Sequence, residues 1–410
     1  MKRVVLIAAG LVLAACGPGE SGVDDAPTGP ADAGETEVAA ANEVNGVTDT
    51  EVVLGTHTDL SGAIAIWGVG VLNGARMRFE EVNEAGGVHG RTIRYIAEDT
   101  QYQIPRAISA ANKLIHRDKI FAMLMAVGTP TNNAVMQEQF EAGVPNIFPG
   151  SGARSMVEPF NKLMFSQHGT YYDEIRAAVK YFAEKEGRTT PCVMYLNNEY
   201  GLEIVEGAQD QAAEMGLEIA EMAAYKITDS EFTAPVIRLR GAGCNLVLMG
   251  SVHRDTILIL EAARKLGWDD VAWVGNNAAY GQVIADQESG SGEGYYAFVH
   301  MAKIYEDDET LTEVQRDWMR RYREKYGEEA GLPAMEGYRG ADLVVVALER
   351  AGRDLTREKF VAAMESINDY TDIFGYKVVF GPDDHKGVSE SALSVVRNGR
   401  WVTLDTSISY

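Results

Sequence analysis

Cysteine is scarce in this sequence, and three cysteines among 410 residues cannot build the disulfide framework of a small secreted scaffold. No run of about 20 apolar residues occurs, so no membrane-spanning helix is expected. Basic residues are outnumbered, with 37 Lys and Arg against 60 Asp and Glu and a net charge of −23. Because this charge repels phosphate backbones, nucleic-acid binding is not expected. The hydrophobic content of 46% indicates instead a globular protein, and the length suggests about two to three domains.

Familiar catalytic and cofactor motifs are also missing. The seven histidines are not paired at metal-ligand spacing and no two cysteines are close together, so no metal site is expected. The sequence has neither a Gly-x-Ser-x-Gly elbow nor a Gly-x-x-x-x-Gly-Lys-Ser/Thr phosphate loop. Gly68, Gly70 and Gly74 approximate a dinucleotide-binding loop, but the last spacing is one residue too long. We therefore expect no cofactor and no catalysis.

The first sixteen residues have the features of a secretion signal. Lys2 and Arg3 precede an apolar run, Val4–Ala15, which is too short to cross a bilayer but typical of a signal-peptide core. The run ends in Leu-Ala-Ala-Cys, which resembles a bacterial lipobox with Cys16 as the lipidated residue. Two or three acyl chains on Cys16 would anchor the protein to a membrane, in the periplasm or at the cell surface. The alternative is an ordinary secretory signal with a chance cysteine.

The segment that follows has the composition of a tether. Pro, Gly, Ala and acidic residues mix without apolar periodicity, and no Lys or Arg occurs between Cys16 and Glu51. Such a segment cannot bury enough apolar surface to offset the entropy lost on ordering. We therefore expect residues 1–15 to be a signal peptide and residues 16–50 a disordered acidic tether.

From residue 51 the chain alternates short apolar runs with amphipathic stretches, a pattern that predicts strands of a parallel sheet connected by helices. Strands of a first unit are predicted at 52–56, 92–97, 120–125 and 144–148. Strands of a second unit are predicted at 192–196, 218–223, 245–249 and 271–274, each preceded by a helix. Three helices and three strand-like pieces follow, at 311–326, 335–351, 357–365, 377–380, 392–397 and 401–404.

The predicted fold is therefore α/β, with two doubly wound, Rossmann-like lobes joined by a hinge. We assign residues 51–168 and about 299–365 to lobe 1, and residues 169–298 and about 366–410 to lobe 2. In open parallel sheets, ligands bind beyond the carboxyl ends of the strands. Two such lobes facing each other would form a cleft that closes around a ligand.

Three polar loops rich in small residues follow strands of the first unit, at 59–62, 128–132 and 150–154. Small residues let backbone amides approach a ligand, and helix N-termini favour its negative end. Each loop alone is typical of an ordinary turn. Three such loops at the same edge of one sheet indicate a binding site.

These loops, in this order, resemble those of the leucine/isoleucine/valine-binding group of type I periplasmic binding proteins, which serve ABC importers. The resemblance covers nearly all of the chain from residue 52. The matching stretches are Leu60-Ser61-Gly62, Trp67-Gly68, Asn73-Gly74-Ala75, Asn83 with Gly86-Gly87, Glu98-Asp99, Lys113-Leu114-Ile115, Gly128-Thr129-Pro130-Thr131-Asn132, Glu199-Tyr200-Gly201 and Ala262-Ala263-Arg264-Lys265-Leu266-Gly267.

The resemblance implies an extracytoplasmic binding protein without enzymatic activity. Such a protein captures a small organic solute (amino-acid-like, a carboxylic acid or an amide) and delivers it to a permease of the branched-chain amino-acid type with its ATPase. The alternative is a two-lobe receptor that senses a ligand without transporting it.

The resemblance also implies a set of ligand-binding residues. Trp67 would form an aromatic wall, Tyr200 would close over the ligand, and an inward-pointing Arg154 would clamp a carboxylate. Asn277 lies near the position of a glutamate that pairs with the ligand ammonium in amino-acid binders, so the ligand need not be an amino acid. The alternative is a structural role for Trp67 or Tyr200 and a surface position for His253 or Arg154. The predicted set is Ser61, Trp67, Gly128, Thr129, Gly152, Ala153, Arg154, Tyr200, Val252, His253, Asn276 and Asn277.

Cys192 and Cys244 each lie at the start of a predicted strand of the second unit. In the doubly wound order the first and third strands are neighbours, so both cysteines would lie at the same end of adjacent strands. An oxidising compartment permits a disulfide between them. The alternative is two free, buried thiols.

Overall fold

The computed structural model describes residues 44–408. The predicted signal peptide, the predicted lipidation site Cys16 and most of the predicted tether lie outside these residues. Residues 44–50, at the end of the predicted tether, form a turn in which the Val53 amide donates to the Gly46 carbonyl over 2.8 Å. Val44 and Val47 of this turn pack against the core. These residues therefore belong to the folded part of the chain.

The first sheet is parallel throughout and has the strand order β2-β1-β3-β4-β5. Its central strands are short and buried, as the apolar runs predict. The strands are β1 (Glu51–Thr58), β2 (Thr92–Asp99), β3 (Ala122–Leu124), β4 (Asn146–Ile147) and β5 (Met164–Phe165). The helices between them are α1 (Ala65–Glu84), α2 (Ile104–Asn112), which continues as a π-helical turn (Lys113–Arg117), and α3 (Thr129–Glu141), followed by a 3-10 turn (Arg154–Met156).

The second sheet has the order β14-β13-β10-β9-β8-β6-β7; the strands β6 to β10 pair in parallel, and β13 pairs antiparallel with both β10 and β14. Its strands are β6 (Pro191–Leu196), β7 (Met222–Tyr225), β8 (Leu246–Gly250), β9 (Ala272–Gly275), β10 (Tyr296–Val299), β13 (Ser391–Arg397) and β14 (Arg400–Ile408). Its connecting helices are α4 (Tyr171–Glu186), α5 (Glu199–Glu214), α6 (Thr233–Gly241), α7 (His253–Lys265), a 3-10 turn (Asn277–Ala279) and α8 (Gln282–Ala285). We call the elements around the first sheet lobe 1 and those around the second sheet lobe 2.

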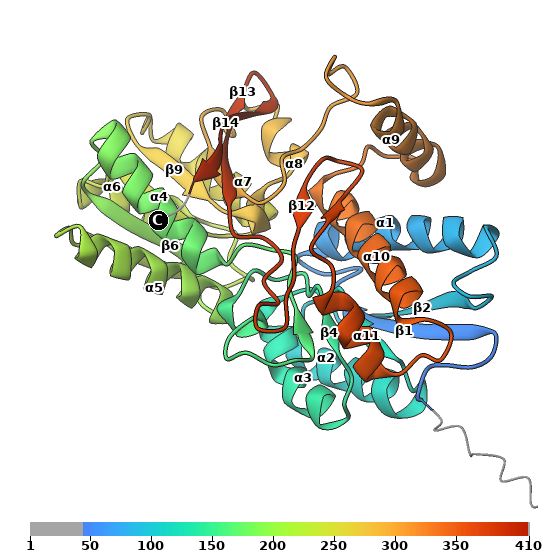
Figure 1. Cartoon of the computed structure of the whole chain (residues 1–410). Coiled ribbons are helices and arrows are strands. Elements are labelled where there is room, and N and C mark those ends of the chain that lie inside the picture. The colour runs from blue at the N-terminus through green and yellow to red at the C-terminus, as the bar shows by residue number, and fades with distance from the viewer. Residues whose placement is uncertain (1–43, 409–410) are drawn as a thin grey trace, which may run out of the picture. The chain divides into compact units, whose positions relative to one another are not determined.

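Later parts of the chain return to lobe 1. These are α9 (Glu313–Tyr326), α10 (Leu332–Ala351), α11 (Arg357–Glu365) and a small hairpin of β11 (Tyr370–Thr371) and β12 (Lys377–Val378). Helix α10 lies along α1 (Figure 1) so closely that a Cβ on Gly74 would lie 2.0 Å from the Ala334 carbonyl oxygen. The Tyr370 hydroxyl donates to Asp342 of α10 over 2.8 Å. The sequence analysis assigned the chain from about residue 366 to lobe 2, whereas this hairpin contacts lobe 1 and only β13 and β14 join the second sheet.

The chain passes between the two sheets through three stretches, which we call the crossing segments: residues 166–170, 300–312 and 379–390. The first and third segments pair with each other, since the Ser166 amide donates to the His385 carbonyl over 3.0 Å. Among the described residues, no helix is both long and apolar enough to cross a bilayer.

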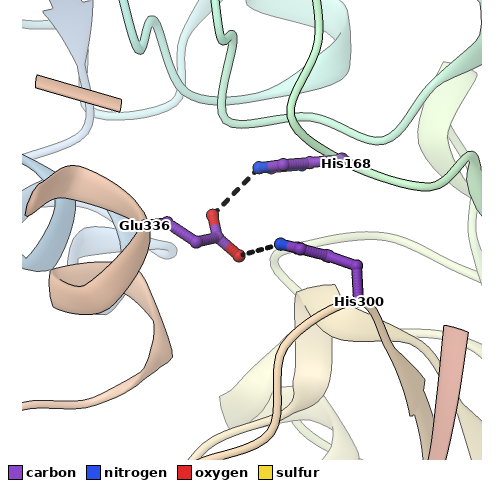
Figure 2. A group of neighbouring side chains, drawn as sticks. All are labelled: His168, His300 and Glu336. Carbon is purple, nitrogen blue, oxygen red and sulfur yellow. Dashed lines mark ion pairs between the residues drawn. The ribbon is translucent and has the colours of Figure 1, made fainter. Parts of the chain in front are cut away.

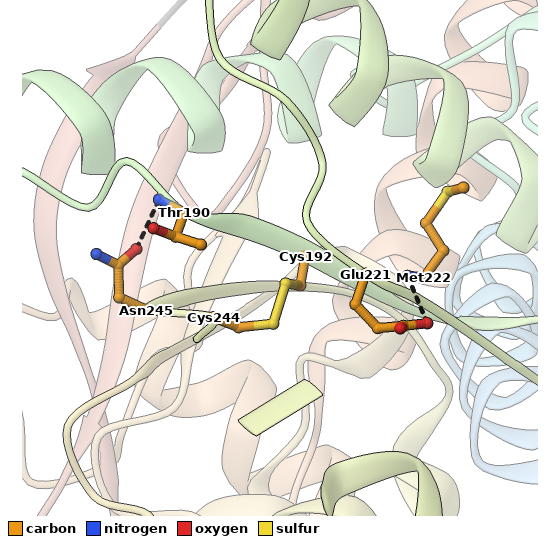
Figure 3. Close-up of a disulfide and its surroundings, with 6 residues drawn as sticks. All are labelled: Thr190, Cys192, Glu221, Met222, Cys244 and Asn245. Atoms are coloured by element: carbon orange, nitrogen blue, oxygen red, sulfur yellow. Dashed lines mark hydrogen bonds between the residues drawn. A yellow bond between two sulfur atoms is a disulfide. The ribbon is translucent and has the colours of Figure 1, made fainter. Parts of the chain in front are cut away.

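Lobe 2 contains a disulfide between Cys192 of β6 and Cys244, which lies just before β8 (Figure 3). The strands β6 and β8 are neighbours in the sheet, as the doubly wound order requires, and the two Cα atoms are 5.8 Å apart. Beside the disulfide, the Thr190 amide donates to Asn245 over 3.0 Å. Both cysteines are buried.

Candidate ligand-binding site

A small cavity lies between the carboxyl ends of the strands of the two lobes. This is the place where parallel sheets bind ligands. Residues of both lobes and of the first crossing segment line it: Ile64, Trp67, Tyr102, Val127, Gly128, Thr129, Gly150, His168, Tyr171, Tyr200, Val252, Asn277 and Ala278.

On the lobe 1 side, the cavity wall includes the N-terminus of α3. Gly128 precedes this helix with a φ of 104°, a conformation that favours glycine, and a Cβ there would lie 2.6 Å from the ring of Tyr102. Thr129 is the first residue of this helix, and its hydroxyl lies 2.8 Å from the Ser151 hydroxyl. The positive end of the helix dipole and these hydroxyls suit the negative end of a ligand.

Aromatic side chains from both lobes form most of the remaining wall. The Trp67 indole, 6% exposed, donates its Nε1–H to the Ala278 carbonyl of lobe 2 over 3.1 Å. The Tyr200 hydroxyl lies 3.1 Å from the Ser251 carbonyl and from Asn276 Oδ1, and the Tyr200 ring meets Tyr171 edge to face at 4.9 Å. These contacts fix the rings that would face an apolar ligand body.

Six of the residues predicted from the sequence line the cavity: Trp67, Gly128, Thr129, Tyr200, Val252 and Asn277. The Asn277 side chain is buried, and its Nδ2 finds no hydrogen-bond partner in the described part of the chain. This amide is therefore available to a ligand.

Four predicted residues lie directly behind this wall. Asn276 positions the Tyr200 hydroxyl and accepts from the Ala278 amide over 3.0 Å. Gly152 and Ala153 lie on the loop after β4, and a Cβ on Gly152 would lie 3.1 Å from the Tyr171 ring. His253 is buried, with its ring 6.4 Å from that of Trp67, and burial lowers the His253 pKa to about 4.

Two predicted residues lie away from the cavity. Ser61 is exposed and donates its hydroxyl to Asp99 over 2.6 Å. The Arg154 guanidinium pairs with Glu206 of lobe 2 and lies 3.8 Å above the Tyr172 ring. Arg154 therefore joins the two lobes outside the cavity, in an open hollow of the surface.

The sequence analysis did not include several lining residues, of which Tyr102 and Tyr171 are the largest. Tyr102 follows β2 with a positive φ of 53°, and its hydroxyl accepts from Asn198 Nδ2 of lobe 2 over 3.2 Å. Burial raises the pKa of both tyrosines, so both phenols are neutral. The position of Tyr102 just after a predicted strand is the signal that could have identified it. The other lining residues that were not predicted are Ile64, Val127, Gly150, His168 and Ala278.

Apart from His168, the cavity wall as formed by residues 44–408 contains no side chain that carries a formal charge at neutral pH. None of the described residues that line it is Asp, Glu, Lys or Arg. A ligand ammonium would therefore lack a carboxylate partner in the wall. A desolvated charge without a partner is unfavourable, so the wall suits an apolar body with one polar or negative end.

The interlobe contact at Arg154 predicts a pH dependence. The Arg154 amide donates to the Glu203 carboxylate over 2.8 Å, and burial raises the Glu203 pKa to about 7 from its ordinary 4.5. Because folded Glu203 holds its proton more strongly than unfolded Glu203, its contribution is fully present below about pH 4.5 and is lost as the pH rises through 7. Between pH 5 and 8, wild type should lose about 3 kcal/mol of unfolding free energy relative to Glu203→Gln.

Urea denaturation of both proteins at pH 5 and pH 8 measures this difference. Glu324→Gln is the matched control, because it removes the charge of an exposed glutamate that pairs with Arg320 on α9, and it should leave the pH dependence of stability unchanged. Parallel pH profiles of wild type and Glu203→Gln would contradict the prediction.

Comparisons with known proteins agree with this architecture. The profile of a family described as periplasmic binding proteins matches residues 51–400. The leucine-, isoleucine-, valine-, threonine- and alanine-binding protein of Pseudomonas aeruginosa is 24% identical over 75% of this chain and 80% of its own length. A substrate-binding periplasmic protein of Ralstonia solanacearum has a solved structure with a TM-score of 0.77 and 25% identity, over 86% of this chain and 99% of that one. A fatty acid ABC transporter substrate-binding protein of Thermomonospora curvata has a TM-score of 0.80 and 23% identity, over 90% of this chain and 95% of that one.

Proposed function

Because the chain belongs to the periplasmic binding protein family, whose members bind solutes and are not enzymes, we propose that it is the substrate-binding component of an ABC importer. It captures a small organic solute between its lobes and presents it to a permease, which works with its ATPase. The observation that carries this proposal is the cavity lined by both lobes, in which Trp67 of lobe 1 already contacts Ala278 of lobe 2. Such contacts favour a closed shape once a matching ligand fills the space between them.

The location we propose is outside the cytoplasm, at a membrane surface. The family supports an extracytoplasmic protein. Lipid anchoring through Cys16 rests on the lipobox-like sequence alone. Mass spectrometry of the mature N-terminus would test it, because an acylated Cys16 is expected as the first residue.

For the ligand we propose a small monocarboxylic acid with an apolar body, or the corresponding amide. The N-terminus of α3 suits a carboxylate, the aromatic rings suit an apolar body, and no lining Asp or Glu offers an ammonium partner. The fatty acid binder of Thermomonospora curvata shows by its description that a protein of this fold serves such a ligand class. Amino acids, which the Pseudomonas aeruginosa relative binds according to its name, would lose an ion pair here.

A thermal-shift screen followed by calorimetry tests the ligand class, with benzoate, hexanoate, benzamide and leucine as probes. Ligand at about 100 times its dissociation constant stabilises the folded state by about 2.7 kcal/mol. The acids or the amide should raise the melting temperature, whereas leucine should not. Stabilisation by leucine together with no response to any acid or amide would contradict the proposed class.

A substitution at Asn277 tests the position of the ligand. Asn277→Glu places a carboxylate in the wall, so like-charge repulsion should weaken binding of an acid by at least about tenfold. Asn277→Gln is the matched control, because it has the same size without the charge. Equal affinities of Asn277→Glu and Asn277→Gln for the acid would show that the ligand lies elsewhere.

A further inference from the structure

Two histidines and a glutamate form a buried cluster where the chain crosses between the lobes (Figure 2). His168 belongs to the first crossing segment, His300 begins the second, and Glu336 lies on α10. Their side chains are 2%, 0% and 1% exposed, respectively. Three polar groups from three separate segments are thus gathered in a site that excludes solvent.

The donor atoms of the cluster converge. His168 Nε2 lies 2.9 Å from one carboxylate oxygen of Glu336, and His300 Nε2 lies 3.1 Å from the other. All three ligand atoms lie within 4.8 Å of one another, and the two rings are stacked with centroids 4.7 Å apart. A single small ion could therefore contact all three side chains after small shifts of their donor atoms.

These short contacts have the distances of ion pairs but lack the angles of well-formed hydrogen bonds. Among the described residues, neither the four ring nitrogens of His168 and His300 nor the two carboxylate oxygens of Glu336 have a partner with hydrogen-bond geometry. Buried polar atoms in native proteins almost always have a partner, so an unsatisfied cluster calls for an additional group. The lone carboxylate among two imidazoles indicates that this group is a cation.

The charge of the nearby Arg339 acts on His300, but its donor groups are directed to other partners. Its Nε and one terminal nitrogen donate to the Gln167 side chain and carbonyl, each over 3.0 Å. Its other terminal nitrogen lies 3.8 Å from Asp372. The arginine therefore has its own partners one helical turn away from Glu336.

We propose that His168, His300 and Glu336 form a binding site for a divalent transition-metal ion of the zinc type. Two imidazoles and one carboxylate are a donor set that Zn²⁺ accepts, with a fourth position left for water. His300 also lines an open hollow of the surface whose wall includes Asp384 and Glu390, so the cluster lies directly beside that hollow. Bound in the cluster, the ion ties two crossing segments to α10, directly behind the wall of the ligand cavity that His168 lines.

The test uses tag-free, chelator-treated full-length protein and Zn²⁺ or Co²⁺ as the probe. Equilibrium dialysis should find one tightly bound Zn²⁺ per chain. One equivalent of Co²⁺ should give visible d–d absorption bands typical of a Co²⁺ ion in a site of low symmetry, without a thiolate charge-transfer band. Zn²⁺ should also raise the melting temperature, since an ion that binds only the folded state stabilises it. His300→Ala and Glu336→Gln should each weaken binding by at least about 100-fold.

His116→Ala is the matched control, because the exposed His116 lies 2.8 Å from Glu138 and represents an adventitious surface site. This variant should keep the tight site. The proposal is overturned if wild type binds no Zn²⁺ at one equivalent, or if a folded His300→Ala or Glu336→Gln keeps wild-type affinity. If neither variant folds, the Co²⁺ spectrum of wild type decides, and its absence overturns the proposal.

Discussion

Replacing both Cys192 and Cys244 by alanine is expected to lower the free energy of unfolding by about 4 kcal/mol. The disulfide joins positions separated by 52 residues, so the oxidised unfolded chain has far fewer conformations than the reduced one. Both sulfur atoms lie in the core of lobe 2 between the adjacent strands β6 and β8. Their removal therefore affects the lobe that supplies Tyr200, Val252 and Asn277 to the cavity. Urea denaturation monitored by circular dichroism measures the loss.

A reductant provides the control for this experiment. Wild type in dithiothreitol should approach the stability of the double variant, because reduction breaks the same link while keeping the side chains. The double variant itself should not respond to the reductant. Equal stability of the oxidised wild type and the double variant would show that the link contributes nothing to folding.

The second large effect is expected at Trp67. Trp67→Ala should weaken binding of the best-stabilising acid from the thermal-shift screen by on the order of 100-fold, or about 3 kcal/mol. The substitution removes the largest side chain of the cavity wall and the interlobe hydrogen bond to Ala278. Both losses act on the closed, ligand-bound form. Isothermal titration calorimetry measures the change in affinity.

Trp67→Phe separates the two contributions. Phenylalanine keeps an aromatic face toward the cavity but lacks the indole N–H, so its affinity should fall between wild type and Trp67→Ala. Circular dichroism at the same temperature verifies that both variants are folded. Unchanged affinity in both variants would mean that Trp67 is only a core residue, which is the alternative that the sequence leaves open.

Apolar runs in the sequence predicted most strands of both sheets, including the short strands β3 and β4. The two residues of β5 are too few to form such a run, and β10 was not predicted. The strand predicted at 218–223 is displaced, because β7 is Met222–Tyr225 and buries only its alternate residues at the sheet edge. Local patterns thus located most strands but missed β5 at a sheet edge and β10, a buried strand in the middle of the second sheet.

In the site, residues that lie in local sequence motifs were predicted, whereas residues that only folding brings together were not. Trp67 and Tyr200 were predicted as ligand-binding residues because the sequence around them resembles a known family, and both line the cavity. Tyr171 lies at the start of a helix, and no local pattern marks its side chain as part of a wall. His168, His300 and Glu336 are far apart in the sequence, so only the folded chain brings them together.

The contact between α1 and α10 has a consequence for biogenesis. Gly74 lies against the Ala334 carbonyl, so lobe 1 needs a helix that is synthesised about 260 residues after its first one. Such long-range contacts form slowly, because a long loop must close before they contribute. The first half of the chain therefore cannot complete its lobe while synthesis is under way. Until α10 has been synthesised, the face of α1 around Gly74 has no covering helix.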